Sequence, residues 1–136
     1  MLFQQTADDL SATHEKVRHT TNSRLMSAIR ERDRELASKL VANADVNSQN
    51  SLGYTPLMLA VDNQDDCICR LLCEEKYINV NQKSLLGGST ALLNACARGH
   101  SGIVKILLLC QSIDVNIQNN LGWTGKFLND NLHSMN

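Results

Sequence analysis

Apolar residues recur at helical spacing in the middle and in the last third of this chain. Positions three and four residues apart share one face of a helix, so both segments predict helices that bury one side against neighbours. The apolar positions are Ile68, Cys69, Leu71 and Leu72 in the middle segment, and Ile103, Val104, Ile106, Leu107 and Leu108 in the later one.

A weaker pattern near the N-terminus predicts two further helices. Residues with short polar side chains cap helix starts, so Thr21-Asn22-Ser23 predicts a helix from about Arg24, and Asp33 predicts the start of a second helix. The apolar positions are Leu25, Met26, Ala28 and Ile29 in the first of these helices, and Leu36, Leu40 and Val41 in the second.

Turn residues repeat at a fixed period along the chain. Thr55, Thr90 and Thr124 are 35 and then 34 residues apart, and asparagines keep almost the same step before them. A period of about 34 residues predicts a stack of small similar units. The aligned segments are Gly53-Tyr54-Thr55-Pro56-Leu57, Gly88-Ser89-Thr90-Ala91-Leu92 and Gly122-Trp123-Thr124, preceded by Asn47, Asn81 and Asn116.

Each unit pairs a short helix with a longer one and then returns to an Asx-Val-Asn loop. This unit resembles the ankyrin repeat over roughly residues 22 to 128. The resemblance implies an all-α ankyrin-repeat solenoid of helix-turn-helix units joined by hairpin-like loops, with about 3 to 3.5 repeats. It rests on Thr55-Pro56-Leu57, Gly99-His100, Ala44-Asp45-Val46-Asn47 and the run from Ile103 to Leu108.

The chemistry of the turn positions supports the same helix boundaries. The threonines of the three aligned segments can cap the first helices, and Pro56 suits the first helical position because its missing N–H is not needed there. Gly53, Gly88 and Gly122 fit turns that require positive φ, and Gly99 fits a left-handed helix end.

The resemblance predicts a division into five segments. The step from Leu25-Met26 to Leu57-Met58 is 32 residues, so the first unit lacks one or two residues, either between its helices or before Ala44. Whether the last segment is a cap or the start of a longer array is left open. The segments are 1–20, an N-terminal arm or capping helix; 21–51, a degenerate repeat; 52–86 and 87–120, full repeats; and 121–136, a partial or capping repeat.

Composition excludes several classes of partner. The net charge of −1 gives no electrostatic basis for binding nucleic acid or an anionic membrane. No apolar run reaches the roughly 18 residues of a membrane span, and residues 1–5 do not resemble a secretory signal. The five cysteines are scattered among helical positions, which favours reduced thiols and an intracellular, cytoplasmic or nuclear, location.

Candidate catalytic and metal sites are weak. Cys67, Cys69 and Cys73 lack metal-knuckle spacing, and the repeat alignment places the last two in core positions. Asp65-Asp66 and Glu74-Glu75 are adjacent pairs on a helix, so the members of each pair diverge. We expect no enzyme activity, no cofactor and no metal.

The resemblance places partner binding on the concave face, formed by loop tips and first helices. Aromatic and arginine side chains are frequent interface anchors. Leu52, Leu86 and Leu121 either face outward or pack between neighbouring loops, and the sequence leaves both open. The expected partner-binding residues are Tyr54, Leu59, Asp62, Asn63, Ser89, Asn94, Arg98 and Trp123.

We therefore predict a non-catalytic module that binds another protein, of unknown identity, without nucleic acid or membrane. One alternative is a structural or regulatory segment of a longer scaffold or of a microbial effector. A less favoured one is nucleotide binding, with a base stacked on Trp123 or Tyr54 and Arg98 or Lys83 near phosphate. Self-association through an exposed end of the stack is also open.

Overall fold

The computed structural model describes residues 16, 17 and 19–126, and places five labelled helices after a helix that includes residues 19–30. That first helix is called the N-terminal helix below. No strand occurs among these described residues, so the predicted all-α fold is confirmed. The labelled helices are α2 (Arg34–Leu40), α3 (Pro56–Asp62), α4 (Asp66–Cys73), α5 (Ala91–Arg98) and α6 (Ser101–Leu108).

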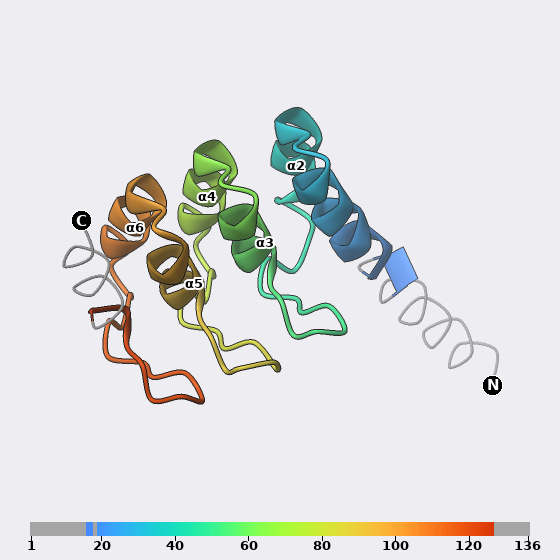
Figure 1. The fold of residues 1–136 in the computed structure, drawn as a ribbon. Coiled ribbons are helices and arrows are strands. Elements are labelled where there is room, and N and C mark those ends of the chain that lie inside the picture. The colour runs from blue at the N-terminus through green and yellow to red at the C-terminus, as the bar shows by residue number, and fades with distance from the viewer. Residues whose placement is uncertain (1–15, 18, 127–136) are drawn as a thin grey trace, which may run out of the picture.

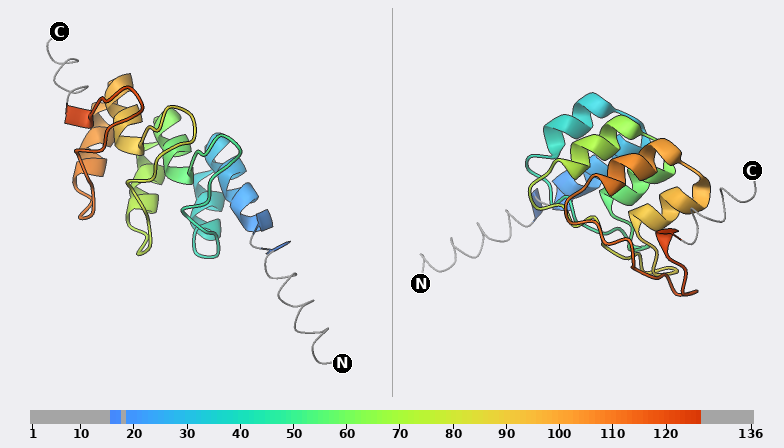
Figure 2. Two further views of the ribbon diagram at one scale, coloured as in Figure 1. Left: turned by 90° about the horizontal axis from the view of Figure 1, so that it is seen from below. Right: turned by 90° about the vertical axis from the view of Figure 1, so that its left-hand side faces the viewer.

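The helices form pairs that stack side by side, and the loops between pairs project away from them (Figure 1). Helix α3 packs against its partner α4 and against α5 of the next pair, while α4 packs against α2 and α6. Figure 2 shows the same row of pairs from two further directions. None of the helices in the described part of the chain is long and apolar enough to cross a membrane.

The core runs through the stack because each helix buries one apolar face against the next pair. The sequence predicts that Leu108 of the final helix is buried with the other apolar positions, but 47% of its surface is exposed. Its equivalent in the preceding pair, Cys73, is half-buried because α6 packs beside α4. The largest fully buried apolar side chains are Leu25, Ile29, Leu57, Met58, Ile68, Leu72, Leu93, Ile103, Leu107, Val61 and Val80.

Side-chain caps define where most helices begin. Thr55 and Thr90 accept hydrogen bonds from backbone N–H groups three residues later, at 3.3 and 3.2 Å, and Pro56 occupies the first position of α3. Asp33 and Asp65 do the same at the starts of α2 and α4, at 3.0 and 3.2 Å. The predicted caps at Asp33, Thr55 and Thr90 are confirmed; the helix expected after Thr124 lies largely outside the described residues.

Three residues at equivalent helix ends adopt positive φ. Gly99 has φ of 71°, as predicted, and Arg32 and Gln64 take 59° and 55° without being glycine. Side-chain bonds offset the strain at both: the Arg32 guanidinium donates to the carbonyl of Asn63, and Gln64 pairs with His100. The sequence does not predict these two bends, because glycine is the residue that signals them.

The predicted start of the N-terminal helix near Arg24 is wrong, because residues 19–23 are already helical. The Thr20 and Thr21 hydroxyls donate to the carbonyls of Lys16 and Val17, at 2.9 Å each. Hydroxyls make this bond to the residue four positions earlier when they lie inside a helix, so they do not cap a new one here.

The residues missing from the first unit are missing before Ala44, and not between its two helices. The capping residues Asp33 and Asp65 are 32 residues apart, whereas Asp45 and Asn79, at the start of the following loops, are 34 apart. The two missing positions therefore lie between the start of α2 and Asp45. In agreement, α2 has 7 residues and α4 has 8.

Asparagines join successive units. Asn47 donates to the carbonyl of Tyr77 and accepts from the N–H of Asn79, both at 2.7 Å. Asn81 repeats this pattern one unit later with Ser112 and Asp114, at 2.7 and 2.8 Å. At the other end of the ladder, Asn22 of the N-terminal helix accepts from Asp45 at 2.7 Å and so takes the role of an asparagine from a preceding unit.

We expect Asn81→Ala to lower the free energy of unfolding by about 1–2 kcal/mol, because two partly exposed bonds between units are lost. Chemical denaturation monitored by circular dichroism measures the change. Asn116→Ala is the control, since Asn116 holds the same position in the last loop and the described residues contain no following unit. Equal losses in the two variants would contradict a role between units.

Candidate functional site

Three hairpin loops, residues 47–54, 81–89 and 116–123, project side by side from the helices (Figure 1). In the first loop the Asn50 carboxamide oxygen accepts from the N–H groups of Leu52 and Tyr54, both at 3.0 Å. In the third, Asn119 accepts equivalently from Leu121 and Trp123, at 2.9 and 3.0 Å. An asparagine side chain that binds backbone two and four residues ahead closes a tight turn, so both tips have a defined shape.

The second hairpin loop is one residue longer than the others. Thr90 lies nine positions after Asn81, whereas the equivalent residues of the first and third loops are eight positions apart. Ser84 replaces the asparagine: its hydroxyl donates to the carbonyl of Leu86 at 2.7 Å and accepts from the N–H of Ser89 at 3.2 Å. Counted from this turn residue, Gly87 aligns with Gly53 and Gly122, so the extra residue is a second glycine, Gly88.

Neighbouring loops are bound to one another. The Gln49 amide donates to the carbonyl of Gly53 in its own loop, at 2.7 Å, and to that of Lys83 in the next, at 3.1 Å. The N–H of Asn120 donates to the carbonyl of Gly87, at 2.9 Å. The loops therefore form a continuous surface, and these bonds hold it in shape before any partner arrives.

Large apolar side chains are exposed at every tip. The exposed fraction is 49% at Leu52, 64% at Leu86 and 71% at Leu121. These leucines therefore face outward, and are not buried between neighbouring loops. The long second loop adds Leu85, 72% exposed, and the third adds Trp123, 43% exposed. These five residues are called the tip surface below.

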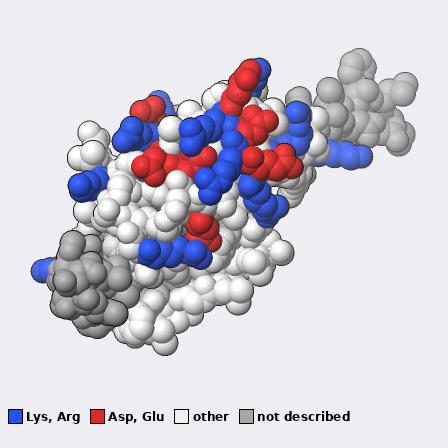
Figure 3. Space-filling model, turned by 45° about the horizontal axis from the view of Figure 1, so that its top comes forward, with Lys and Arg blue, Asp and Glu red and all other residues white. Residues whose placement is uncertain are grey.

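The hairpin loops are almost free of charge. Their three ranges contain one charged residue, Lys83, in a chain with 13 basic and 14 acidic residues. In Figure 3 most of the charged side chains gather over the upper part of the molecule, and the lower right of the view is white. The apolar tips are therefore surrounded by uncharged Asn, Gln and Ser side chains.

The residues predicted for partner binding lie in three different settings. Tyr54 and Leu59 are half-buried and pack against the core. Trp123 is exposed at the third tip. The remaining five lie on or beside the first helices and mostly bind one another or the preceding unit. They are Asp62, Asn63, Ser89, Asn94 and Arg98.

Asp62 and Arg98 form an ion pair between α3 and α5. Arg98 Nε lies 3.3 Å from Asp62 Oδ1, and the two side chains are 52% and 21% exposed. Burial raises the pKa of the Asp62 carboxyl above its ordinary value, and electrostatic interaction with neighbouring groups, Arg98 first, partly offsets this rise. The pair neutralises the charge that these helices would otherwise present.

Asn63, Ser89 and Asn94 also make internal bonds. Asn63 donates to the carbonyl of Ile29 in the N-terminal helix, at 2.8 Å. The Ser89 hydroxyl bonds to the Asn94 carboxamide oxygen, at 2.6 Å. These side chains orient the surface between the loops and the first helices, so their substitution would change its shape as well as its chemistry.

None of three cavities in the described residues involves the side chains considered for nucleotide binding. The first has a volume of about 830 Å³ and lies between α4 and α6. The second has about 360 Å³ and lies at Asp45, Asn47 and Tyr77, and the third has about 210 Å³ and lies at Leu92, Val104 and Leu108. None of the three is lined by Tyr54, Lys83, Arg98 or Trp123.

The cysteines considered for a metal lie as the repeat alignment predicts. Cys69 is fully buried, Cys73 is half-buried in the core, and Cys67 is exposed. Burial raises the pKa of the Cys69 thiol to about 12, which disfavours the thiolate that binds metals. The described residues contain no group of three His, Cys, Asp or Glu side chains that could hold a metal ion.

The family assignment rests on the whole row of units. The family model for ankyrin repeats (3 copies) matches residues 25–119. The chain belongs to the ankyrin-repeat family. Ankyrin repeats are in general protein–protein interaction modules. The predicted family and fold class are confirmed.

Two relatives share part of this ankyrin-repeat chain. It is 36% identical to the putative ankyrin repeat protein YahD of Escherichia coli (strain K12) over 83 residues, 61% of this chain and 40% of that protein. It is 38% identical to ankyrin repeat and SAM domain-containing protein 6 of Rattus norvegicus over 89 residues, 63% of this chain and 10% of that protein. The chain thus matches less than half the length of either relative.

Sequence reasoning missed one residue of the tip surface of this ankyrin-repeat chain. Leu85 is the most exposed of the five, and it occupies the position of Ser51 in the first loop and of Asn120 in the third. The signal for it was a leucine in place of these polar residues, whereas the 35-residue step between Thr55 and Thr90 reflects the inserted Gly88.

Proposed function

We propose that this ankyrin-repeat chain binds another protein on its concave face, with the tip surface supplying the apolar anchors. The observation that carries the proposal is the exposure of Leu52, Leu86 and Leu121, one at each loop. Exposed apolar patches of this kind mark interaction sites, since they gain free energy when a partner removes them from water.

The rigidity of the loops supports the same proposal. The asparagine-closed turns and the bonds from Gln49 and Asn120 to neighbouring loops order the tips before binding. A surface that is already ordered loses little conformational entropy on association, so more of the gain from apolar burial appears as affinity.

The charge pattern defines the chemistry of the partner. The tip surface is flanked by one charged side chain, Lys83, and the nearby Asp62–Arg98 pair is internally neutral. The partner therefore presents apolar side chains within an uncharged polar surface. Binding that does not depend on charge changes little with salt, because screening acts on ionic interactions.

We expect the triple variant Leu52→Ser/Leu86→Ser/Leu121→Ser to weaken partner binding about 100-fold or more, because each anchor contributes roughly 1 kcal/mol. The full chain is used to capture proteins from a cell extract, and the retained protein is then purified and titrated calorimetrically with parent and variant. The parent complex should persist in high salt.

Leu109→Ser is the matched control, because Leu109 is 84% exposed and lies beyond α6, outside the hairpin loops. It should bind as the parent does. Trp123→Ala tests the exposed aromatic separately. Equal binding by the triple variant, or equal loss with Leu109→Ser, would overturn the proposed surface, provided that circular dichroism shows all variants folded.

A further inference from the structure

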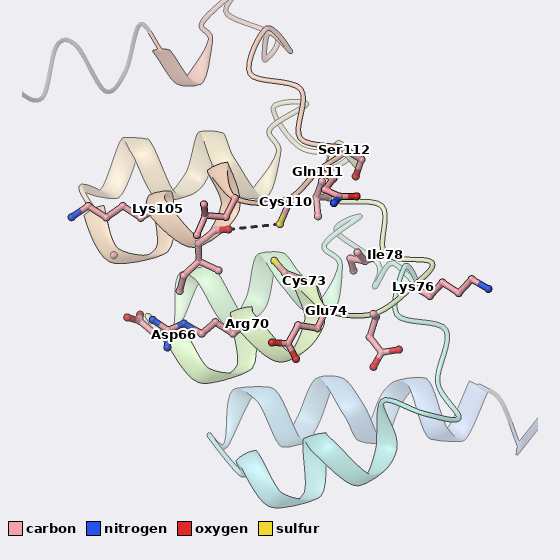
Figure 4. A pocket seen from close by; sticks show the side chains of 15 residues that line it. Asp66, Arg70, Cys73, Glu74, Lys76, Ile78, Lys105, Cys110, Gln111 and Ser112 are labelled. Carbon is pink, nitrogen blue, oxygen red and sulfur yellow. Dashed lines mark hydrogen bonds between the residues drawn. The ribbon is translucent and has the colours of Figure 1, made fainter.

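The second helices of two successive units enclose a groove of about 830 Å³ that the proposed function does not use. Helix α4 and α6 form its walls, and it extends to the loop residues that follow each helix (Figure 4). Hairpin tip residues do not line it. The groove opens to solvent, so small reagents can reach its floor.

Two cysteines from different units meet in this groove. Cys73 is the last residue of α4, and Cys110 follows the end of α6. Both are half-buried, and Figure 4 shows their sulfur atoms directed towards one another. The two thiols lie close enough to interact electrostatically, and the Cys110 thiol donates to the carbonyl oxygen of Ile106 at 3.7 Å.

The other three cysteines lie in different surroundings. Cys69 and Cys96 are buried at 0% and 2% exposure, and Cys67 is exposed on α4. None of these three lines the groove. The pair in the groove therefore combines two properties that a disulfide requires: a facing thiol partner within the same chain and access for an oxidant.

We propose that Cys73 and Cys110 are an oxidation site, at which a hydroperoxide converts the two thiols into a disulfide between successive repeats. One cysteine, as thiolate, attacks an oxygen of hydrogen peroxide; the O–O bond breaks, and a sulfenic acid and water form once a proton is taken up. The second thiolate attacks the sulfenic sulfur, the S–S bond forms, and hydroxide leaves and is protonated to a second water. Two thiols are oxidised and one peroxide is reduced to two waters.

The bond would join the end of α4 to the segment after α6 and so hold two units together. Cross-linking residues 73 and 110 restricts the unfolded chain, which should raise Tm by about 5–15 °C. Burial, together with the neighbouring Cys110, raises the pKa of the Cys73 thiol above its ordinary value, so oxidation at neutral pH is slow.

The test is to treat the folded full chain with hydrogen peroxide, alkylate the remaining thiols and digest with trypsin without reduction. Trypsin places Cys73 in the peptide of residues 71–76, Cys110 in 106–126, Cys96 in 84–98, and Cys67 with Cys69 in 40–70. We expect one cross-linked product, 71–76 joined to 106–126, in a monomeric chain that has lost two hydrogen atoms. Reductant should restore both peptides and reverse the rise in Tm.

Cys67→Ser is used as the background, because it removes the exposed thiol and keeps the pair. Cys73→Ala and Cys110→Ala in that background should each lose the cross-link and the reductant-dependent shift in Tm, while their circular dichroism stays that of the parent. Recovery of both groove cysteines as alkylated or singly oxidised peptides in the folded parent would overturn the proposal, as would a different disulfide pairing.

Discussion

Gly53→Ala should lower the free energy of unfolding by about 2–5 kcal/mol, the sum of a conformational cost and an overpacking cost. Gly53 has φ of 78°, a conformation that costs a residue with a side chain about 1–2 kcal/mol. A Cβ added there would also lie 2.4 Å from the backbone nitrogen of Leu85 in the next loop, and such overpacking adds about 1–3 kcal/mol.

Gly122→Ala separates these two contributions. Gly122 occupies the same turn position in the third loop with φ of 80°, and a Cβ there has no heavy atom within 4 Å. It should cost about 1–2 kcal/mol, the conformational part alone. Denaturation curves of both variants measure the difference; equal costs would show that the first and second loops separate easily, against the continuous surface proposed for binding.

Asp65→Ala should cost about 2–3 kcal/mol. The Asp65 side chain has no exposed area, caps α4 by accepting from the N–H of Ile68 at 3.2 Å, and lies 3.2 Å from Arg34 Nε of the preceding unit. Alanine leaves the buried N–H of Ile68 without its acceptor, which adds to the ordinary loss of a helix cap.

Asp65→Asn tests which of the two interactions matters. Asparagine keeps an oxygen that can cap α4 but removes the charge opposite Arg34. Because Arg34 is 59% exposed and can be solvated, the ion pair should contribute only about 1 kcal/mol or less. Thermal and chemical denaturation of both variants decide the matter: an asparagine variant as unstable as the alanine one would show that the ion pair between units, and not the cap, stabilises this helix.

Much of the fold can be predicted from the sequence because its signals are local. A cap such as Thr55 or Thr90 acts on an N–H three residues later, and Gly99 permits the bend at its own position. The start of the N-terminal helix was predicted wrongly because the local signal is ambiguous. Thr21 can cap a helix start, and it can equally donate to a carbonyl four residues earlier inside a helix. Only the preceding residues, already helical, select between them.

By itself, the sequence determined the period, the order of helices and loops, the helix starts at Asp33, Thr55 and Thr90, and membership of the repeat family. Tertiary structure alone decided which leucines face solvent, which of the predicted binding residues are engaged inside the stack, and that Cys73 meets Cys110. Helix caps and turns depend on residues a few positions apart. Exposure and thiol pairing instead depend on residues about 35 positions away, which come together only when successive units pack.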